Sequence, residues 1–117
     1  MLRELTKDCV HCGFCLPTCP TYSALWREES DSPRGRILLM QGLLDGTVEL
    51  SPTVVSHFDR CLGCMACVTS CPSGVQYDRL IELTRADVEE RFRRSLGERL
   101  LRSAIFLTFP HPRRMRA

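Results

Sequence analysis

The feature that most constrains this 117-residue chain is a cysteine motif that occurs twice. The two runs span residues 9–20 and 61–72, and each reads C-x2-C-x2-C-x3-C-P. All eight cysteines of the chain lie in these runs. Three thiols at i, i+3 and i+6 can surround one compact group, whereas the fourth lies a helical turn further on and points away from it. Pro20 and Pro72 then fix φ directly after the fourth cysteine.

This spacing is typical of two-cluster ferredoxins, in which the fourth cysteine of each run ligates the cluster of the other run. The sequence therefore predicts two [4Fe–4S] clusters with crossed ligands. The ligands expected for the first cluster are Cys9, Cys12, Cys15 and Cys71. The ligands expected for the second cluster are Cys61, Cys64, Cys67 and Cys19.

Two other uses of eight cysteines fit the pattern less well. A disulfide framework needs a secreted context, and the charged segment 1–8 lacks the apolar region of a signal peptide. Structural zinc uses paired C-x2-C units with four ligands per site, which leaves the third cysteine and the C-P of each run unexplained. Free thiols in this number indicate a reducing compartment, so a cytoplasmic protein is expected. A structural module whose metal only holds the fold remains the alternative.

Length and charge restrict the function further. A chain of this size is expected to form one domain, and no apolar run reaches the roughly 18 residues of a membrane span. The formal charge of +2 counts every thiol as neutral. Each oxidised cluster with its four thiolates carries about −2, so the loaded protein is near −2. Nucleic acid is therefore not expected as a partner.

Helix signals fill the sequence between and after the runs. Ser32 and Ser51 each precede a proline, which is the usual pairing of an N-cap with proline at the first helical position. Gly46 and Pro110 are helix-ending residues. Helices are expected over residues 33–45, 52–58, 77–95 and 98–109, with a break at Gly97. Because no strand or hairpin signal is present, the sequence predicts an all-α fold, an α-helical ferredoxin.

Several side chains near the cysteines have expected roles. A dry shell around both clusters is predicted from the apolar residues Val10, Phe14, Leu16, Leu62, Met65 and Val68. His11 is not needed as a ligand, because four cysteines complete each cluster. Arg34 and Arg36 either ease the addition of an electron to a nearby cluster or form a solvated helix start. The sequence leaves these two alternatives open.

Three segments carry a more specific resemblance. They are residues 9–22 (CVHCGFCLPTCPTY), 32–40 (SPRGRILLM) and 61–77 (CLGCMACVTSCPSGVQY). In them the chain resembles the N-terminal part of the glycolate oxidase iron–sulfur subunit family. Related families are the lactate-utilisation iron–sulfur proteins and the small subunit of anaerobic glycerol-3-phosphate dehydrogenase. The resemblance implies an electron-transfer subunit that relays electrons from an FAD-containing flavoprotein, a 2-hydroxy-acid dehydrogenase, towards a membrane quinone pool.

The chain departs from that family in one respect. Family members continue into two Cys-rich modules with a Cys-Cys-Gly signature, and no such signature occurs here. The chain is therefore expected to be an N-terminal fragment or a truncated gene product. Residues 1–96 are expected to form the ferredoxin domain. Residues 97–117 are expected to form a helix and a basic connector towards the absent modules.

No catalytic constellation occurs in the sequence, so the chain is expected to be the non-catalytic electron-transfer component of an oxidoreductase complex. It is expected in the cytoplasm, or at the inner face of the membrane through the complex. Whether the partner oxidises glycolate, lactate or glycerol phosphate stays open.

Overall fold

The computed structural model describes residues 1–116, and every regular element in them is helical. The helices are α1 (Leu2–Lys7), α2 (Pro33–Asp45), α3 (Pro52–Asp59), α4 (Ala66–Thr69), α5 (Tyr77–Arg91), α6 (Leu96–Thr108) and α7 (Pro112–Met115). A π-helix, η1 (Thr21–Trp26), and a 3-10 helix, η2 (Glu29–Asp31), connect the first cysteine run to α2. The prediction of an all-helical fold is confirmed. Within the described residues, no helix combines the length and the apolar character needed to cross a bilayer.

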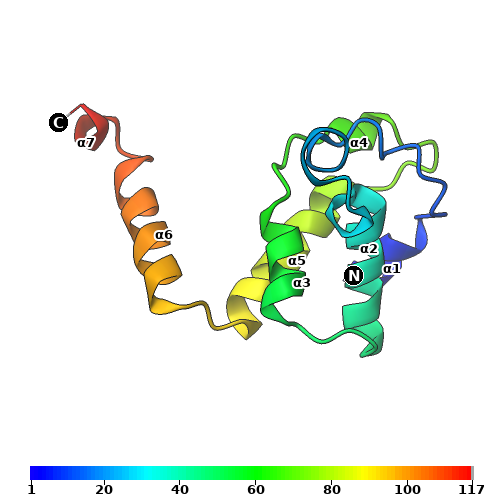
Figure 1. Ribbon diagram of the computed structural model, residues 1–117, viewed down its shortest axis with the longest axis horizontal. Coiled ribbons are helices and arrows are strands. Elements are labelled where there is room, and N and C mark those ends of the chain that lie inside the picture. Colours follow the sequence, from blue (N-terminus) through cyan, green and yellow to red (C-terminus); the bar gives the residue numbers. More distant parts are fainter. Residues whose placement is uncertain (117) are drawn as a thin grey trace.

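Helices α2, α3 and α5 pack together as the body of the molecule, and α1 lies against α2 and α5 (Figure 1). Phe58 of α3 and Leu80 of α5 are completely buried at the centre. The other buried members of this core are Ile37, Met40, Val54, Val55, Cys67, Val75, Tyr77, Ile81 and Val88. Val75 and Tyr77 closely follow the second cysteine run, so they connect the core directly to the end of that run.

The starts of α2 and α3 follow the predicted capping pattern. Ser32 Oγ accepts a hydrogen bond of 2.9 Å from the Gly35 amide, and Ser51 Oγ accepts one of 3.3 Å from the Val54 amide. Gly35 is also required for packing, because a Cβ there would overlap the backbone carbonyl of Glu29. The first turn of α2 therefore lies directly on η2.

Helix α5 ends earlier than predicted, at Arg91 rather than at Ser95. Arg94 explains the difference. Its side chain is nearly buried and donates to both carboxylate oxygens of Asp59, at 2.6 and 3.0 Å. Arg94 reaches the end of α3 because the chain leaves the helix after Arg91. Phe92, the first residue after the helix, has an extended conformation.

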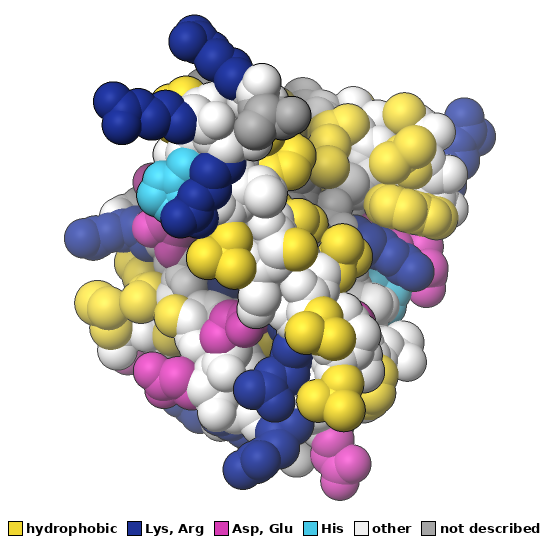
Figure 2. All heavy atoms as spheres, turned by 90° about the vertical axis from the view of Figure 1, so that its left-hand side faces the viewer, with side chains coloured by type: hydrophobic (Ala, Val, Ile, Leu, Met, Phe, Trp, Pro, Cys, Tyr) yellow, Lys and Arg dark blue, Asp and Glu magenta, His cyan; other side chains and the backbone are white. Residues whose placement is uncertain are grey.

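The predicted break at Gly97 is wrong, because Gly97 is the second residue of α6. The helix begins one residue earlier, with Ser95 as its N-cap and Glu98 completing a capping box. None of the residues in α6 is buried, and α6 and α7 stand apart from the body (Figure 1). Figure 2 looks at the molecule from this side and shows hydrophobic side chains exposed between arginines.

Candidate metal centres

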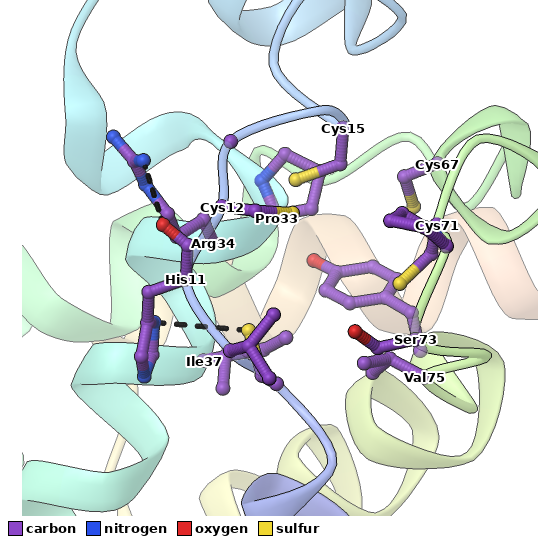
Figure 3. A pocket seen from close by; sticks show the side chains of 15 residues that line it. His11, Cys12, Cys15, Pro33, Arg34, Ile37, Cys67, Cys71, Ser73 and Val75 are labelled. Atoms are coloured by element: carbon purple, nitrogen blue, oxygen red, sulfur yellow. Dashed lines mark hydrogen bonds between the residues drawn. The ribbon is translucent and has the colours of Figure 1, made fainter.

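The first cysteine run and the end of the second enclose one pocket. We call its cysteines Cys9, Cys12, Cys15 and Cys71 the first site. Figure 3 shows Cys15 and Cys71 on opposite sides of this space, with their sulfur atoms directed into it. Cys67 also lines the pocket. The fold thus brings Cys71 to three cysteines that lie more than fifty residues earlier in the chain.

The second cysteine run and the end of the first enclose a second pocket. We call its cysteines Cys19, Cys61, Cys64 and Cys67 the second site. Apart from Cys67, which lines both pockets, the first pocket combines three cysteines of the first run with Cys71, and the second combines Cys61 and Cys64 with Cys19. This is the grouping that the crossed pattern predicts, and the assignment of each ligand stays a prediction.

The two pockets share a wall. Pro33, Cys67 and Tyr77 line both of them. Pro33 opens α2 and Tyr77 opens α5, so two helix starts separate the sites. A charge placed at either site is consequently close to the other site and to the same two helix N-termini.

The residues present fit a multi-atom group held by thiolates. The spaces not filled by protein atoms are about 420 Å³ at the first site and about 290 Å³ at the second, partly open to solvent. Within residues 1–116, no three His, Cys, Asp or Glu side chains converge on the position of a single metal ion. Four thiol groups that line each pocket form the soft sulfur donor set of an iron–sulfur cluster.

Both runs turn around their pockets through left-handed residues at the same two places. The second residue after the first cysteine is His11 in one run (φ +54°) and Gly63 in the other (φ +67°). The residue after the second cysteine is Gly13 (φ +87°) or Met65 (φ +59°). The single glycine of each run thus stands at a different one of the two turns. This explains why Gly13 and Gly63 do not align in the repeat.

Around the first site the polar contacts come from His11 and Arg34. His11 Nδ1 lies 3.7 Å from Cys9 Sγ, so the histidine is the neighbour of a cysteine sulfur atom (Figure 3). Arg34 donates to the His11 carbonyl at 3.0 Å and forms an ion pair of 2.7 Å with Glu29. The Arg34 side chain is 27% exposed, so water reaches this arginine.

Around the second site two hydroxyl groups approach sulfur. Thr21 Oγ1 lies 3.1 Å from Cys19 Sγ, and the Tyr77 hydroxyl donates to Cys61 Sγ at 3.7 Å. Arg36, whose side chain is 1% exposed, also lines this pocket and donates twice to Thr21 Oγ1, each time at 3.2 Å. The interpretation of Arg36 as part of a solvated helix start is therefore wrong.

A buried charge cluster holds Arg36 in place. Its centre is the fully buried carboxylate of Asp31, which lies 3.5 Å from Arg36 Nη2, 3.0 Å from His57 Nδ1 and 3.0 Å from Arg60 Nη1. Arg36 Nε additionally donates to the His57 carbonyl at 2.6 Å. Every buried polar side-chain atom in the described residues has a partner. Sequence reasoning did not find this cluster, because its members lie on η2, α2 and α3 and share no motif.

Burial changes the acidity of the cysteines. It raises the pKa of the Cys9 and Cys15 thiols above the ordinary value, and it raises that of Cys67 to about 12. At neutral pH these thiols are protonated when no metal is bound. Binding iron therefore displaces their protons.

The predicted dry shell is only partly present. Val10 lines the first pocket and Leu62 the second, but they are 66% and 65% exposed; Phe14 is 67% exposed and lines neither pocket. Met65 and Val68, by contrast, pack against the core. Val10 and Leu62 both follow the first cysteine of a run and are exposed to nearly the same degree. Tyr77 and Pro33 supply buried or partly buried wall at both pockets, and Arg36 does so at the second.

Comparison with known proteins assigns the chain to a family. The 4Fe-4S dicluster domain matches residues 5–75, which include all eight cysteines. The chain belongs to this family. The predicted cofactors, two [4Fe–4S] clusters, and the predicted fold class are thereby confirmed. No solved structure matches the chain.

Two similar proteins extend the likeness over nearly the whole chain. The chain is 47% identical over 111 residues to the probable glycolate oxidase iron-sulfur subunit of Bacillus subtilis, which covers 94% of this chain. It is 46% identical over 114 residues to the glycolate oxidase iron-sulfur subunit of Escherichia coli, which covers 97%. A heterodisulfide reductase of Methanosarcina barkeri has a subunit that is 30% identical over 104 residues. The predicted resemblance to the glycolate oxidase iron-sulfur subunits is confirmed.

These relatives are much longer than the chain. The matched region is 25% of the B. subtilis protein and 28% of the E. coli protein. The chain thus spans about a quarter of the length of the curated relatives it matches.

Proposed function

We propose that this chain is the electron-transfer part of a flavin-dependent complex that oxidises a 2-hydroxy acid such as glycolate. The observation that carries the proposal is the pair of adjoining pockets, each lined by cysteines of both runs. A [4Fe–4S] cluster supplies reversible one-electron chemistry when it is bound. Two neighbouring sites can therefore take the two electrons of a flavin one at a time.

In this proposal the cysteines of each site are the ligands of one cluster, with Cys71 completing the first site and Cys19 the second. The protein's other residues hold these cysteines in position. Arg85 does so for the second run by donating to the carbonyls of Phe58 and Cys61, at 3.0 and 2.5 Å. It thereby joins the end of α3 to the first cysteine of that run. In this proposal the chain does not itself oxidise the substrate. The proposed partner that does so is a flavoprotein with FAD. The proposed compartment is the reducing cytoplasm.

The test is the anaerobic purification of the chain, followed by iron and sulfide analysis and spectroscopy. We expect a brown protein with broad visible absorption and about eight iron atoms, from two four-iron clusters, per chain. Dithionite should bleach it and produce an electron paramagnetic resonance (EPR) signal. A colourless protein that binds zinc would overturn the proposal in favour of a structural metal module.

A second experiment concerns the partner. The pure chain should not reduce an artificial dye with glycolate, lactate or glycerol 3-phosphate. Addition of the cognate flavoprotein should make reduction of the chain depend on one of these acids, which identifies the substrate. Turnover of any of them by the chain alone would contradict the assignment of the oxidation to a partner.

Residues 97–117 have a separate proposed role as a docking element. The α6 residues that face α5 across a groove are Arg99, Arg102, Ser103 and Phe106. Leu100, Leu101 and Ile105 lie elsewhere on the helix and are exposed. Exposed apolar surface of this kind marks an interface. About three quarters of each longer relative lies outside the match, and we propose that the corresponding region packs on α6.

Hydrogen exchange tests this docking. The amides of α6 should exchange rapidly in the isolated chain and slowly when the unmatched remainder of the B. subtilis relative is added as a separate protein. Equal exchange in both samples would contradict the proposed occupant.

A further inference from the structure

The first turn of α2 carries two arginines, Arg34 and Arg36, whose side chains have different surroundings. Arg34 lines only the first pocket, and Arg36 lines only the second. Residues two apart in an α-helix are separated by about 200° around its axis. The two side chains therefore leave the helix on opposite sides, with Pro33 of the shared wall next to them.

We propose that this turn assigns one arginine to each cluster, and that Arg36 sets the reduction potential of the second site through its buried positive charge. The proposal rests on the proposed function, because it needs a redox cluster at each site. Reduction adds one electron, and hence one negative charge, to a site. A fixed cation nearby stabilises the reduced form and raises the potential.

Three contacts concentrate this effect at the second site. The two N–H groups of Arg36 that reach Thr21 Oγ1 occupy the lone pairs of that oxygen. The single hydroxyl proton of Thr21 donates to the Asp31 carbonyl at 2.7 Å in this structure, and the same oxygen lies 3.1 Å from Cys19 Sγ, to which the proton can turn. A cysteine thiolate has no proton of its own, so the latter contact can exist only as O–H···S⁻, a charge-assisted bond.

The charges around Arg36 do not cancel its effect. Among residues 1–116, Asp31 is the one carboxylate in contact with it, and Arg60 binds the other oxygen of that carboxylate. The cluster thus carries two guanidinium groups for one carboxylate. At the first site the single arginine, Arg34, is paired with Glu29 and reached by water. Its field is screened by salt, whereas that of a buried group is screened much less.

The test is a potentiometric titration of the loaded protein followed by EPR, with Arg36→Gln, Arg36→Lys and Arg34→Gln compared. In Arg36→Gln we expect one of the two midpoint potentials to fall, with about a tenfold change in the ratio of reduced to oxidised centre at fixed potential. That change corresponds to 59 mV for a one-electron couple. Arg36→Lys retains the charge and should restore most of the shift.

Arg34→Gln is the matched control. It should lower the other midpoint, by less than Arg36→Gln does, and the shift should shrink as salt is raised. If Arg36→Gln and Arg34→Gln move the same midpoint, or if Arg36→Gln moves neither, the inference is overturned. A wild-type protein without iron–sulfur clusters would overturn the proposed function as well. Loaded clusters with unresponsive potentials would overturn only this inference.

Conservative variants cover the case in which Arg36→Gln does not fold. Thr21→Val and Tyr77→Phe remove the hydroxyl groups at Cys19 and Cys61 and keep the size of the side chain. Both should lower the midpoint that Arg34→Gln leaves unchanged. Tyr22→Phe changes the chain's other tyrosine, which lines neither pocket, and should shift nothing. If Thr21→Val moves no midpoint, or moves the one that responds to Arg34→Gln, the inference is wrong.

Discussion

The first and second sites share one motif and differ in what surrounds it. At the second site Cys19 and Cys67 are buried, whereas every cysteine of the first site is at least partly exposed. The second site is backed by the buried cluster centred on Asp31, and the first by one arginine near the surface. The repeat therefore places the cysteines, while residues outside it give each site its own electrostatic environment.

The largest effect is expected from removing the crossed cysteines. Cys71→Ala should abolish the same spectroscopic component as Cys9→Ala, because both residues line the first pocket. Cys19→Ala should abolish the component that is lost in Cys61→Ala. Iron analysis and EPR of the four variants provide the comparison. Ser73→Ala, at the rim of the first pocket, is the control and should retain both components. A Cys71→Ala spectrum that matches Cys61→Ala would refute the crossed pairing.

The next largest effect is expected from Gly35→Ala, which should weaken both sites equally. Gly35→Ala places a Cβ on the Glu29 carbonyl and pushes the first turn of α2 away from η2. We expect the free energy of unfolding to fall by about 2–4 kcal/mol, with weaker loading of both clusters. Gly97→Ala is the matched control, because a Cβ at that helical position meets open space. It should stabilise α6 by up to about 1 kcal/mol. Denaturant titrations measure both, and a loss confined to one site would show that α2 does not support the two together.

A smaller effect should separate the sites again. Gly13 and Gly63 both have positive φ, so alanine at either position is strained, by about 1–2 kcal/mol. At Gly13 the new Cβ would also lie 2.8 Å from Arg34 Nη1, whereas at Gly63 it would meet nothing. Gly13→Ala should therefore destabilise the loaded protein more than Gly63→Ala does. Thermal unfolding of the two variants measures this difference. The reverse order of stability would contradict the close approach of Arg34 to the turn at Gly13.

The smallest effect is expected from truncation after Ser95. Residues 96–116 include no buried side chain, and the ion pair that joins them to α5 is the exposed pair of Arg102 with Glu89. Such pairs contribute about 0–1 kcal/mol. The truncated protein should therefore load both clusters and unfold within about 1 kcal/mol of the full chain. If either cluster is lost, α6 supports a site and is not merely an appended helix.

The parts of the fold that follow local rules could be predicted from the sequence. Ser32 and Ser51 with their prolines indicated the starts of α2 and α3, because capping acts within one turn. The end of α5 could not be foreseen, since it depends on the long-range pairing of Arg94 with Asp59. The eight cysteines were evident from their spacing, and they line two pockets, while the ligand set of each cluster stays a prediction.

The surroundings of the sites were predicted less well. A repeat position does not say which side of the loop faces solvent, and the exposed Val10 and Leu62 show the consequence. The contact of Asp31 with His57 joins residues 26 positions apart, for which no local pattern exists. The sequence left two interpretations of Arg36 open, and its burial in the structure ruled out the solvated one.

The position of Cys71 at the first site has a consequence for biosynthesis. The ribosome releases the first run long before residue 71, so Cys9, Cys12 and Cys15 emerge without their proposed fourth partner. With the proposed ligands, neither cluster can be completed until the chain has passed through the second run. The early thiols must remain reduced throughout that interval. On this assignment, completion of either cluster is a late step, because it depends on the two cysteine runs having already met.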